Sequence, residues 1–197
     1  MLISAKNHRV KELQKVDENQ PHAFKIKGKN RFSLGAQKVS LTELIGPICK
    51  GDIIHIPSMG NWSLVDMIEY IIEQIGSSEV HLTSWAVSEK SVVTLLNLRN
   101  QGLISSLHCL FDTRLPSQST AAWQLCDANI ESLKLTKIHA KVVALKSETH
   151  AVCIVTTANL TENPRIERYV ITESDSLYEY EMDWIIRSIN NAKPFKA

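Results

Sequence analysis

From residue 51 onward, short apolar segments of strand length alternate with amphipathic segments of helical length, and this alternation limits the possible folds more than any other feature. The expected strands are 52–57, 79–86, 105–112, 129–135, 138–147, 150–157 and 168–174, and the expected helices are 63–76, 88–102, 118–126 and 176–189. Strands and helices that alternate through short links form a sheet covered by helices. A short polar turn joins 138–147 to 150–157, as in a β-hairpin, so we expect a mixed sheet. The sequence thus predicts an α/β sandwich.

The N-terminal part of the chain differs from the rest in charge. The net charge is only +1, but residues 1–50 contain ten Lys or Arg against four Asp or Glu, whereas residues 51–197 contain twelve against seventeen. Residues 1–38 also lack a clear helix or strand period. We therefore expect a basic N-terminal arm or extension over residues 1–38 and the α/β domain over residues 39–197.

Within the arm, basic side chains lie between two phenylalanines, and they are Lys25, Lys27, Lys29 and Arg31. Basic residues interleaved with aromatic rings can follow a phosphate backbone and stack on bases. The same pattern also suits a solvated edge strand, whose lysines discourage aggregation between sheets. Both interpretations stay open at the level of the sequence.

Several classes of protein are disfavoured by the composition. No apolar run is long enough to cross a bilayer, and the N-terminus lacks the apolar core of a secretory signal, so we expect a soluble, cytoplasmic protein that does not act at a membrane. The four cysteines are widely spaced, without a Cys-x-x-Cys pair or a cysteine–histidine cluster of zinc spacing. We expect reduced thiols, no bound metal and no cofactor.

The residues between 138 and 171 carry the pattern most typical of chemistry. His139 and Lys141 are separated by one residue on an expected strand, so their side chains should project from the same face. Thr157 and Asn159 share a face at the end of the next strand, and Glu167 follows shortly after. An imidazole, an ammonium, a hydroxyl and an amide that converge on one point can hold the oxygens of a phosphoryl group during in-line attack.

This segment resembles the HKD signature of the phospholipase D superfamily, and the small single-motif, prophage-type members in particular. The signature combines His-x-Lys, a strand that ends in a small-residue turn, an Asn and a downstream Glu. The resemblance implies a phospholipase D-like α-β-α sandwich and a metal-independent reaction through a phosphohistidine. It also implies that Glu167 orients the imidazole, and that two copies of the chain form one active site in a homodimer, because this sequence has a single motif.

The sequence departs from the signature at two places. Lys146 stands where the family usually has Asp, and Thr156 and Thr157 stand where it usually has Gly and Ser. The Asp is not credited with the chemistry in the family, but the threonines add bulk beside the expected phosphate site.

Two loops after the first expected strands should lie near the site, as the resemblance implies. They contain Asn61, Trp62, Ser84 and Trp85. These residues are candidates for a substrate groove, although core packing is the favoured role for both tryptophans. The histidines within other expected strands, at positions 55, 81 and 108, are expected to be residues at the edge of the core.

The function expected from these features is a phosphodiesterase, in particular a nuclease, acting on nucleic acid as a homodimer. One alternative is a catalytically silent nucleic-acid-binding or scaffold protein with the same fold. A second alternative is a lipid-directed enzyme of the phospholipase D type.

Overall fold

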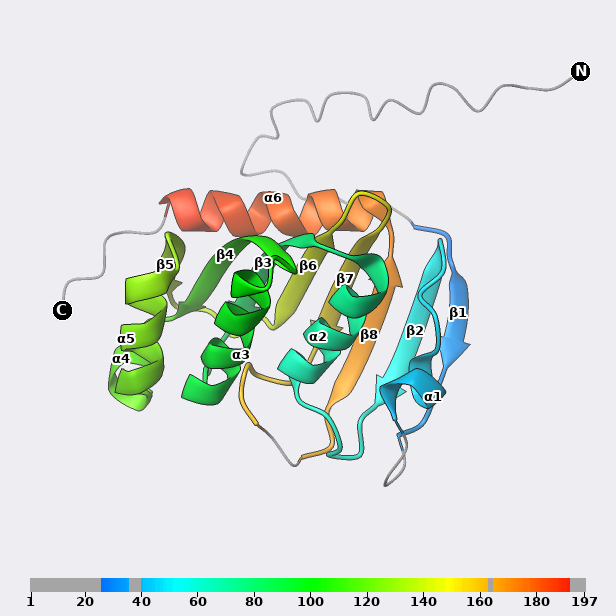
Figure 1. Ribbon diagram of the computed structural model, residues 1–197, viewed down its shortest axis with the longest axis horizontal. Helices are drawn as coiled ribbons and strands as arrows, with labels where there is room; N and C mark the ends of the chain where they lie inside the picture. Colours follow the sequence, from blue (N-terminus) through cyan, green and yellow to red (C-terminus); the bar gives the residue numbers. More distant parts are fainter. Residues whose placement is uncertain (1–25, 36–39, 163–164, 192–197) are drawn as a thin grey trace, which may run out of the picture.

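A computed structural model describes residues 26–35, 40–162 and 165–191 (Figure 1). These residues form one eight-stranded sheet with the order β1-β2-β8-β7-β6-β3-β4-β5. The strands are β1 (Lys29–Phe32), β2 (Asp52–Pro57), β3 (Ser78–Ser84), β4 (Ile104–Asp112), β5 (Ser132–Thr136), β6 (Val142–Lys146), β7 (Ala151–Thr156) and β8 (Arg168–Glu173). The helices are α1 (Leu41–Ile45), α2 (Leu64–Ile75), α3 (Glu89–Asn100), α4 (Leu115–Gln118), α5 (Thr120–Asn129) and α6 (Asp175–Asn191).

The sheet is mixed, as the sequence predicts. Strands β3, β4 and β5 pair in parallel, and β1 pairs in parallel with β2. Strands β6 and β7 form the expected antiparallel hairpin, and β6 also pairs antiparallel with β3. The start of β6, which follows His139 and Lys141, therefore lies beside the end of β3, more than 50 residues earlier in the chain.

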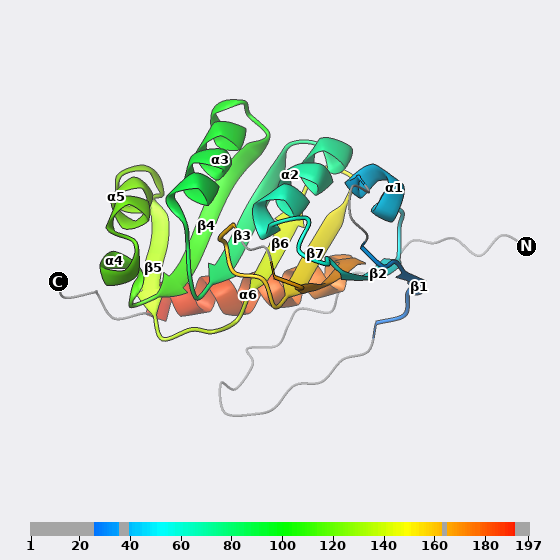
Figure 2. The same cartoon turned by 90° about the horizontal axis from the view of Figure 1, so that it is seen from below.

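Helices cover both faces of the sheet. Figure 2 shows α2 and α3 on one face and the long α6 across the other. Alternation along β3 explains the division: Val80 and Leu82 enter the main apolar core, whereas His81 and Thr83 project to the face covered by α6. The architecture is therefore the predicted α-β-α sandwich.

The helix α2 illustrates how the sequence sets the layers. Ser63 caps its N-terminus by accepting a hydrogen bond from the amide of Asp66, and the Asp66 carboxylate accepts one from the Ser63 amide at 2.7 Å. Its apolar residues recur at helical spacing, and the side chains of Ile68, Ile71 and Ile72 are fully buried. The helix ends at Gly76, whose φ of 89° favours a residue without a side chain.

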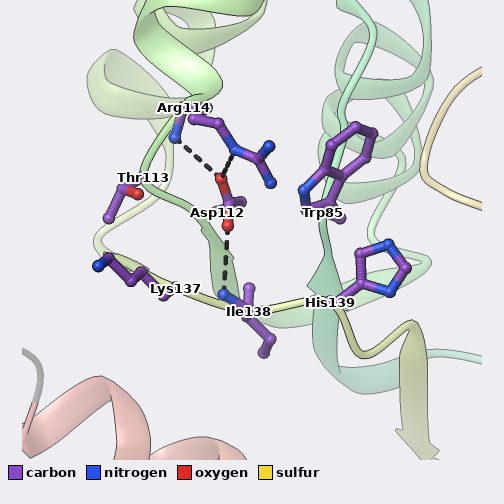
Figure 3. A pocket seen from close by; sticks show the side chains of 7 residues that line it. All are labelled: Trp85, Asp112, Thr113, Arg114, Lys137, Ile138 and His139. Atoms are coloured by element: carbon purple, nitrogen blue, oxygen red, sulfur yellow. Dashed lines mark hydrogen bonds and ion pairs between the residues drawn. The ribbon is translucent and has the colours of Figure 1, made fainter.

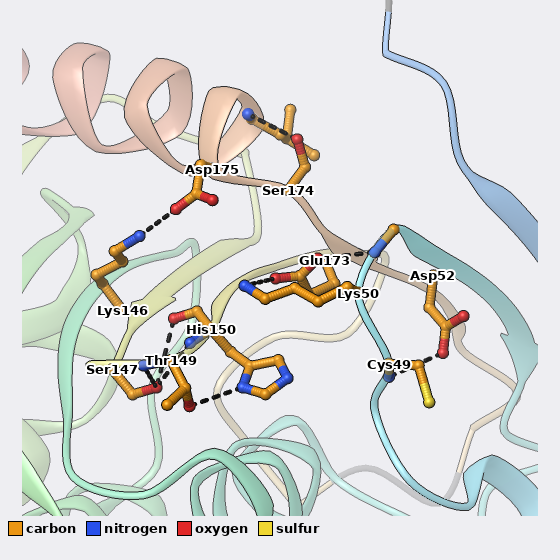
Figure 4. A network of polar contacts seen from close by, with 12 residues as sticks. Cys49, Lys50, Asp52, Lys146, Ser147, Thr149, His150, Glu173, Ser174 and Asp175 are labelled. Atoms are coloured by element: carbon orange, nitrogen blue, oxygen red, sulfur yellow. Dashed lines mark hydrogen bonds and ion pairs between the residues drawn. The ribbon is translucent and has the colours of Figure 1, made fainter. Parts of the chain in front are cut away.

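Ion pairs fasten the loops and α6 to the sheet (Figure 4). Lys146 at the end of β6 pairs with Asp175 in the first turn of α6. Lys50 pairs with the buried carboxylate of Glu173 at 2.8 Å, and the amide of Gly51 donates to the same carboxylate. Lys146, which departs from the family signature, thus has a structural role at the start of α6.

The elements differ from the sequence expectations in two respects. The strand expected over 138–147 begins only at Val142, so His139 and Lys141 lie in the segment that enters β6. The short helices α1 and α4 lie where the sequence predicted no helix. Within the described ranges, no helix has the length and apolar character needed to cross a bilayer.

Candidate active site

Lys141 lies against His139 at the entrance to β6. Lys141 is 7% exposed, whereas His139 is exposed. The Lys141 Nζ donates to the His139 carbonyl oxygen at 2.8 Å and lies 3.1 Å from Nδ1 and 3.3 Å from Nε2 of the His139 ring. Burial lowers the pKa of Lys141, and the negative charge of Glu167 partly opposes this shift. The ammonium thus lies beside the imidazole and within the field of a carboxylate.

The backbone around Lys141 is held by Thr83 of β3. The Thr83 hydroxyl donates to the Ala140 carbonyl at 3.1 Å and accepts a hydrogen bond from the Val142 amide at 3.0 Å. On the other side, the Thr156 amide donates to the Lys141 carbonyl at 3.1 Å. Because Thr83 is fully buried, the clamp is shielded from water. Two neighbouring strands therefore set the position of the His-x-Lys segment.

Asp112 holds the same segment from the end of β4 (Figure 3). Its Oδ2 accepts a hydrogen bond from the Ile138 amide at 3.2 Å, and its Oδ1 accepts from Nε of Arg114 at 2.6 Å. Burial alone would raise the pKa of Asp112, but the hydrogen bonds from Arg114 and Ile138 outweigh it and lower the pKa below its ordinary value. The ionised carboxylate of Asp112 thus holds the backbone of Ile138 and the side chain of Arg114 in position.

Arg114, Trp85 and His139 lie next to one another at the pocket. The Arg114 guanidinium carbon lies 4.5 Å from the Trp85 ring centroid, at cation–π distance. The Trp85 and His139 ring centroids are 5.6 Å apart, with the planes tilted by 59°. As Figure 3 shows, the Trp85 ring lies between the other two side chains.

The side chains of Arg114, Trp85 and His139 border a pocket of about 510 Å³. Its lining residues are Trp85, Asp112, Thr113, Arg114, Lys137, Ile138 and His139. Two basic side chains, Arg114 and Lys137, line it against one carboxylate, which is already paired with Arg114. A cleft with such charges and an aromatic wall suits an anionic ligand that carries a ring.

Thr157, Asn159 and Glu167 lie beyond the end of β7. The Thr157 hydroxyl donates to Oε2 of Glu167 and accepts from the Arg168 amide. The amide of the buried Ser58, which follows β2, donates to the Glu167 carbonyl, and the Glu167 amide donates to the Ser58 hydroxyl. The side-chain oxygen Oδ1 of Asn159 is buried without a hydrogen-bond partner among the described residues. An amide oxygen in this state is available to a donor from a ligand or from another chain.

Comparison with solved structures identifies the fold. Over 67% of this chain and 90% of the other, the structure superposes on Nuc, a phospholipase D family member from Salmonella typhimurium, with a TM-score of 0.52 and 12% sequence identity. This chain has a phospholipase D-like fold. No protein-family model and no curated protein matches the sequence. The similarity therefore extends to the fold alone, and the roles of individual residues in a phospholipase D-like site depend on the geometry described above.

The four residues expected to line a substrate groove, Asn61, Trp62, Ser84 and Trp85, occupy different environments in the structure. Trp85 lines the pocket, whereas Trp62 packs against the main core and its carbonyl accepts a hydrogen bond from Tyr169. Ser84 is fully buried: its hydroxyl donates to Ala86 and accepts from the amide of Leu160. Ser84 therefore holds the residue after Asn159 and cannot line a groove, which corrects the sequence expectation. Asn61 is exposed but is not among the residues lining the pocket.

The basic residues near the N-terminus also separate into two groups. Lys25 lies outside the described residues, whereas Lys27 and Lys29 are exposed before and within the edge strand β1. Arg31 pairs with Asp52 at 2.8 Å and donates to the carbonyls of Pro47 and Ile45. Its guanidinium is therefore occupied by the fold, and the edge-strand interpretation describes β1.

Sequence reasoning missed four residues of the site: Thr83, Asp112, Arg114 and Lys137. Asp112 ends an expected strand and Arg114 follows it, and polar groups at the carboxyl end of a parallel strand are typical of functional sites. The sequence therefore contained a signal for Asp112 and Arg114. It contained no such signal for Thr83, because the role of Thr83 depends on the pairing between β3 and β6.

Proposed function

We propose that this chain is a metal-independent phosphodiesterase, specifically a nuclease, that forms a phosphohistidine on His139 in a homodimeric active site. The observation that carries the proposal is the contact between His139 and Lys141 at the rim of a pocket that also presents Arg114 and Lys137. A phosphodiester is an anion, and cations placed around it stabilise the charge that develops during phosphoryl transfer.

The chemistry needs two imidazoles. The ring nitrogen of His139 attacks phosphorus, so a P–N bond forms while the bond from phosphorus to the leaving oxygen breaks. The partner's His139 donates a proton to that oxygen. The same imidazole then removes a proton from water, whose oxygen attacks phosphorus and breaks the P–N bond. The sequence holds one His-x-Lys pair, so the second must come from another copy of the chain.

Other residues would assist this reaction. Lys141 is placed to contact a non-bridging phosphoryl oxygen once its ammonium swings from the ring of His139. Asn159 would contact the same group through Nδ2, because the amide nitrogen donates whereas Oδ1, which no described residue engages, can only accept. Burial lowers the pKa of Lys141, but the charge of Glu167 acts in the opposite direction and favours the ammonium form that phosphate requires.

A dimer is supported by apolar side chains exposed near the motif. Val155 on β7 is 42% exposed and Ile166, beside Glu167, is 64% exposed. Apolar side chains close to an incomplete site are typical of interfaces. Nucleic acid as substrate is supported by the Trp85 ring in the pocket and by the exposed Lys27 and Lys29.

The test uses the purified protein with single-stranded DNA, duplex DNA, RNA and a small phosphodiester, without added metal and with EDTA. We expect cleavage of at least one nucleic acid by a dimer, and a covalent phosphoprotein after acid-free quenching. Cleavage that requires magnesium would contradict the mechanism. A stable monomer, or a folded dimer that binds nucleic acid without cleaving it, would favour the silent scaffold; activity restricted to phospholipid vesicles would favour the lipid-directed alternative.

A further inference from the structure

A second cluster of titratable side chains lies under α6, outside the candidate active site. Glu79 and His81 project from β3 toward α6, and His108 projects from β4 directly opposite His81. One ligand atom from each of the three residues lies within 4.8 Å of the other two. The Nε2 atoms of His81 and His108 lie 3.2 Å and 3.4 Å from Oε1 of Glu79.

The state of His81 points to a missing ligand. Its side chain is 2% exposed, yet neither ring nitrogen makes a hydrogen bond to any described residue, although Oε1 of Glu79 lies 3.2 Å from Nε2. A buried imidazole without partners is costly, and buried polar groups in proteins are almost always satisfied. The His81 ring stacks on that of His108 with centroids 4.5 Å apart, so two charged rings would repel each other.

We propose that Glu79, His81 and His108 bind one zinc ion, or a divalent transition metal of similar preference, between the sheet and α6. Two imidazoles and one carboxylate form a set of ligands typical of zinc. Ligand bonds of about 2.0–2.1 Å in a tetrahedron place neighbouring ligand atoms about 3.3–3.4 Å apart. The two measured distances from Oε1 of Glu79 match this edge length.

Surrounding groups orient two of the three ligands, His108 and Glu79. The Ser132 hydroxyl lies 2.8 Å from Nδ1 of His108, and a bond donated by Nδ1 leaves the Nε2 lone pair for the metal. The Tyr178 hydroxyl of α6 donates to the other oxygen of Glu79, Oε2, at 3.3 Å.

The site would stabilise the fold and take no part in the proposed hydrolysis. The ion would join β3 to β4 directly, and to α6 through Tyr178. The side chain of Glu79 is 42% exposed, which gives a metal ion a route from solvent. Metal ions that bind only the folded state stabilise it by mass action.

The experiment measures zinc binding by the full chain after EDTA treatment and removal of the chelator. We expect one zinc per chain by calorimetry, and a rise in Tm of roughly 5–10 °C when zinc is about 100-fold above its Kd. Cobalt in place of zinc should produce the visible absorption of a tetrahedral site. The variants Glu79→Gln and His108→Gln should each weaken zinc binding by at least about 100-fold, since each removes a ligand.

The controls separate a built site from incidental binding. His150→Gln, which alters a partly exposed histidine that contacts Thr149, should leave zinc affinity unchanged. Ser132→Ala should weaken affinity by about tenfold, as expected for a residue that orients a ligand. Circular dichroism of each apo variant verifies folding. The proposal is overturned if the wild type binds no zinc at micromolar concentration, if both ligand variants bind as the wild type does, or if His150→Gln abolishes binding.

Discussion

The ammonium of Lys141 lies 3.1 Å from Nδ1 of His139, while the same ammonium donates to the His139 carbonyl. In the proposed first step a ring nitrogen of His139 attacks phosphorus, and an ammonium beside it can hold a phosphoryl oxygen. The nucleophile and the cation that this step requires therefore lie in direct contact.

Substitutions at this pair should act on chemistry and leave the fold intact. His139→Ala should abolish cleavage, because the residue serves as nucleophile in one protomer and as acid in the other. Lys141→Ala should slow cleavage somewhat over 100-fold if about 3 kcal/mol of transition-state stabilisation is removed. Initial rates at saturating substrate measure both, with His150→Ala as a matched histidine control. Residual cleavage by His139→Ala would exclude the phosphohistidine route.

Thr83→Val tests the clamp that holds the His-x-Lys segment. Valine keeps the shape but leaves the Ala140 carbonyl and the Val142 amide without the Thr83 hydroxyl. We expect a decrease of about 1–3 kcal/mol in the free energy of unfolding and a fall in kcat greater than any change in KM. Urea denaturation and steady-state kinetics measure these effects. Thr94→Val, which removes an exposed hydroxyl bonded to its own helix, should change neither.

Asp112 should make stability depend on acid pH. Its pKa in the folded state lies below the ordinary 3.8, so its ionised form stabilises the fold above that value, and this contribution is lost as pH falls through the folded-state pKa. Asp112→Asn should cost about 1–3 kcal/mol at pH 7, since the interaction with Arg114 is no longer an ion pair. The difference between wild type and variant should shrink below about pH 4. Urea midpoints from pH 7 to pH 3 measure this, and a constant difference would contradict the assignment.

The lysines of the N-terminal segment should act on binding, and Arg31 should act on folding. Replacing Lys25, Lys27 and Lys29 with Ala should flatten the slope of log affinity against log salt by up to about 0.9 for each phosphate of duplex DNA that a lysine no longer neutralises. Arg31→Ala should instead lower stability by about 1–2 kcal/mol, because the buried Asp52 is left without this partner. Salt titrations with labelled DNA and thermal unfolding separate the two effects. An unchanged slope would mean that these lysines contact no DNA phosphates and that the segment is only a solvated edge strand.

The local pattern of the sequence predicts much of this fold. Apolar residues at helical spacing, with Ser63 as the cap and Gly76 at the end, determine α2. The apolar runs on either side of a polar turn determine the hairpin of β6 and β7. Both depend on residues close together in the chain, so periodicity and turn chemistry are sufficient to locate them. The order His139, Lys141, Asn159 and Glu167 is likewise visible without coordinates.

Tertiary structure alone decides what surrounds these residues. Thr83 reaches Val142 across 59 positions and Asp112 reaches Ile138 across 26, because β3 pairs with β6 on one side and with β4 on the other. Lys29 and Arg31 look equivalent in sequence, but among the described residues it is Arg31 that forms an ion pair with the buried Asp52. Local propensity specifies which segments become helices and strands, whereas strand order specifies which distant side chains meet. That order follows from burying the apolar faces of the whole sheet at once, which no short segment encodes.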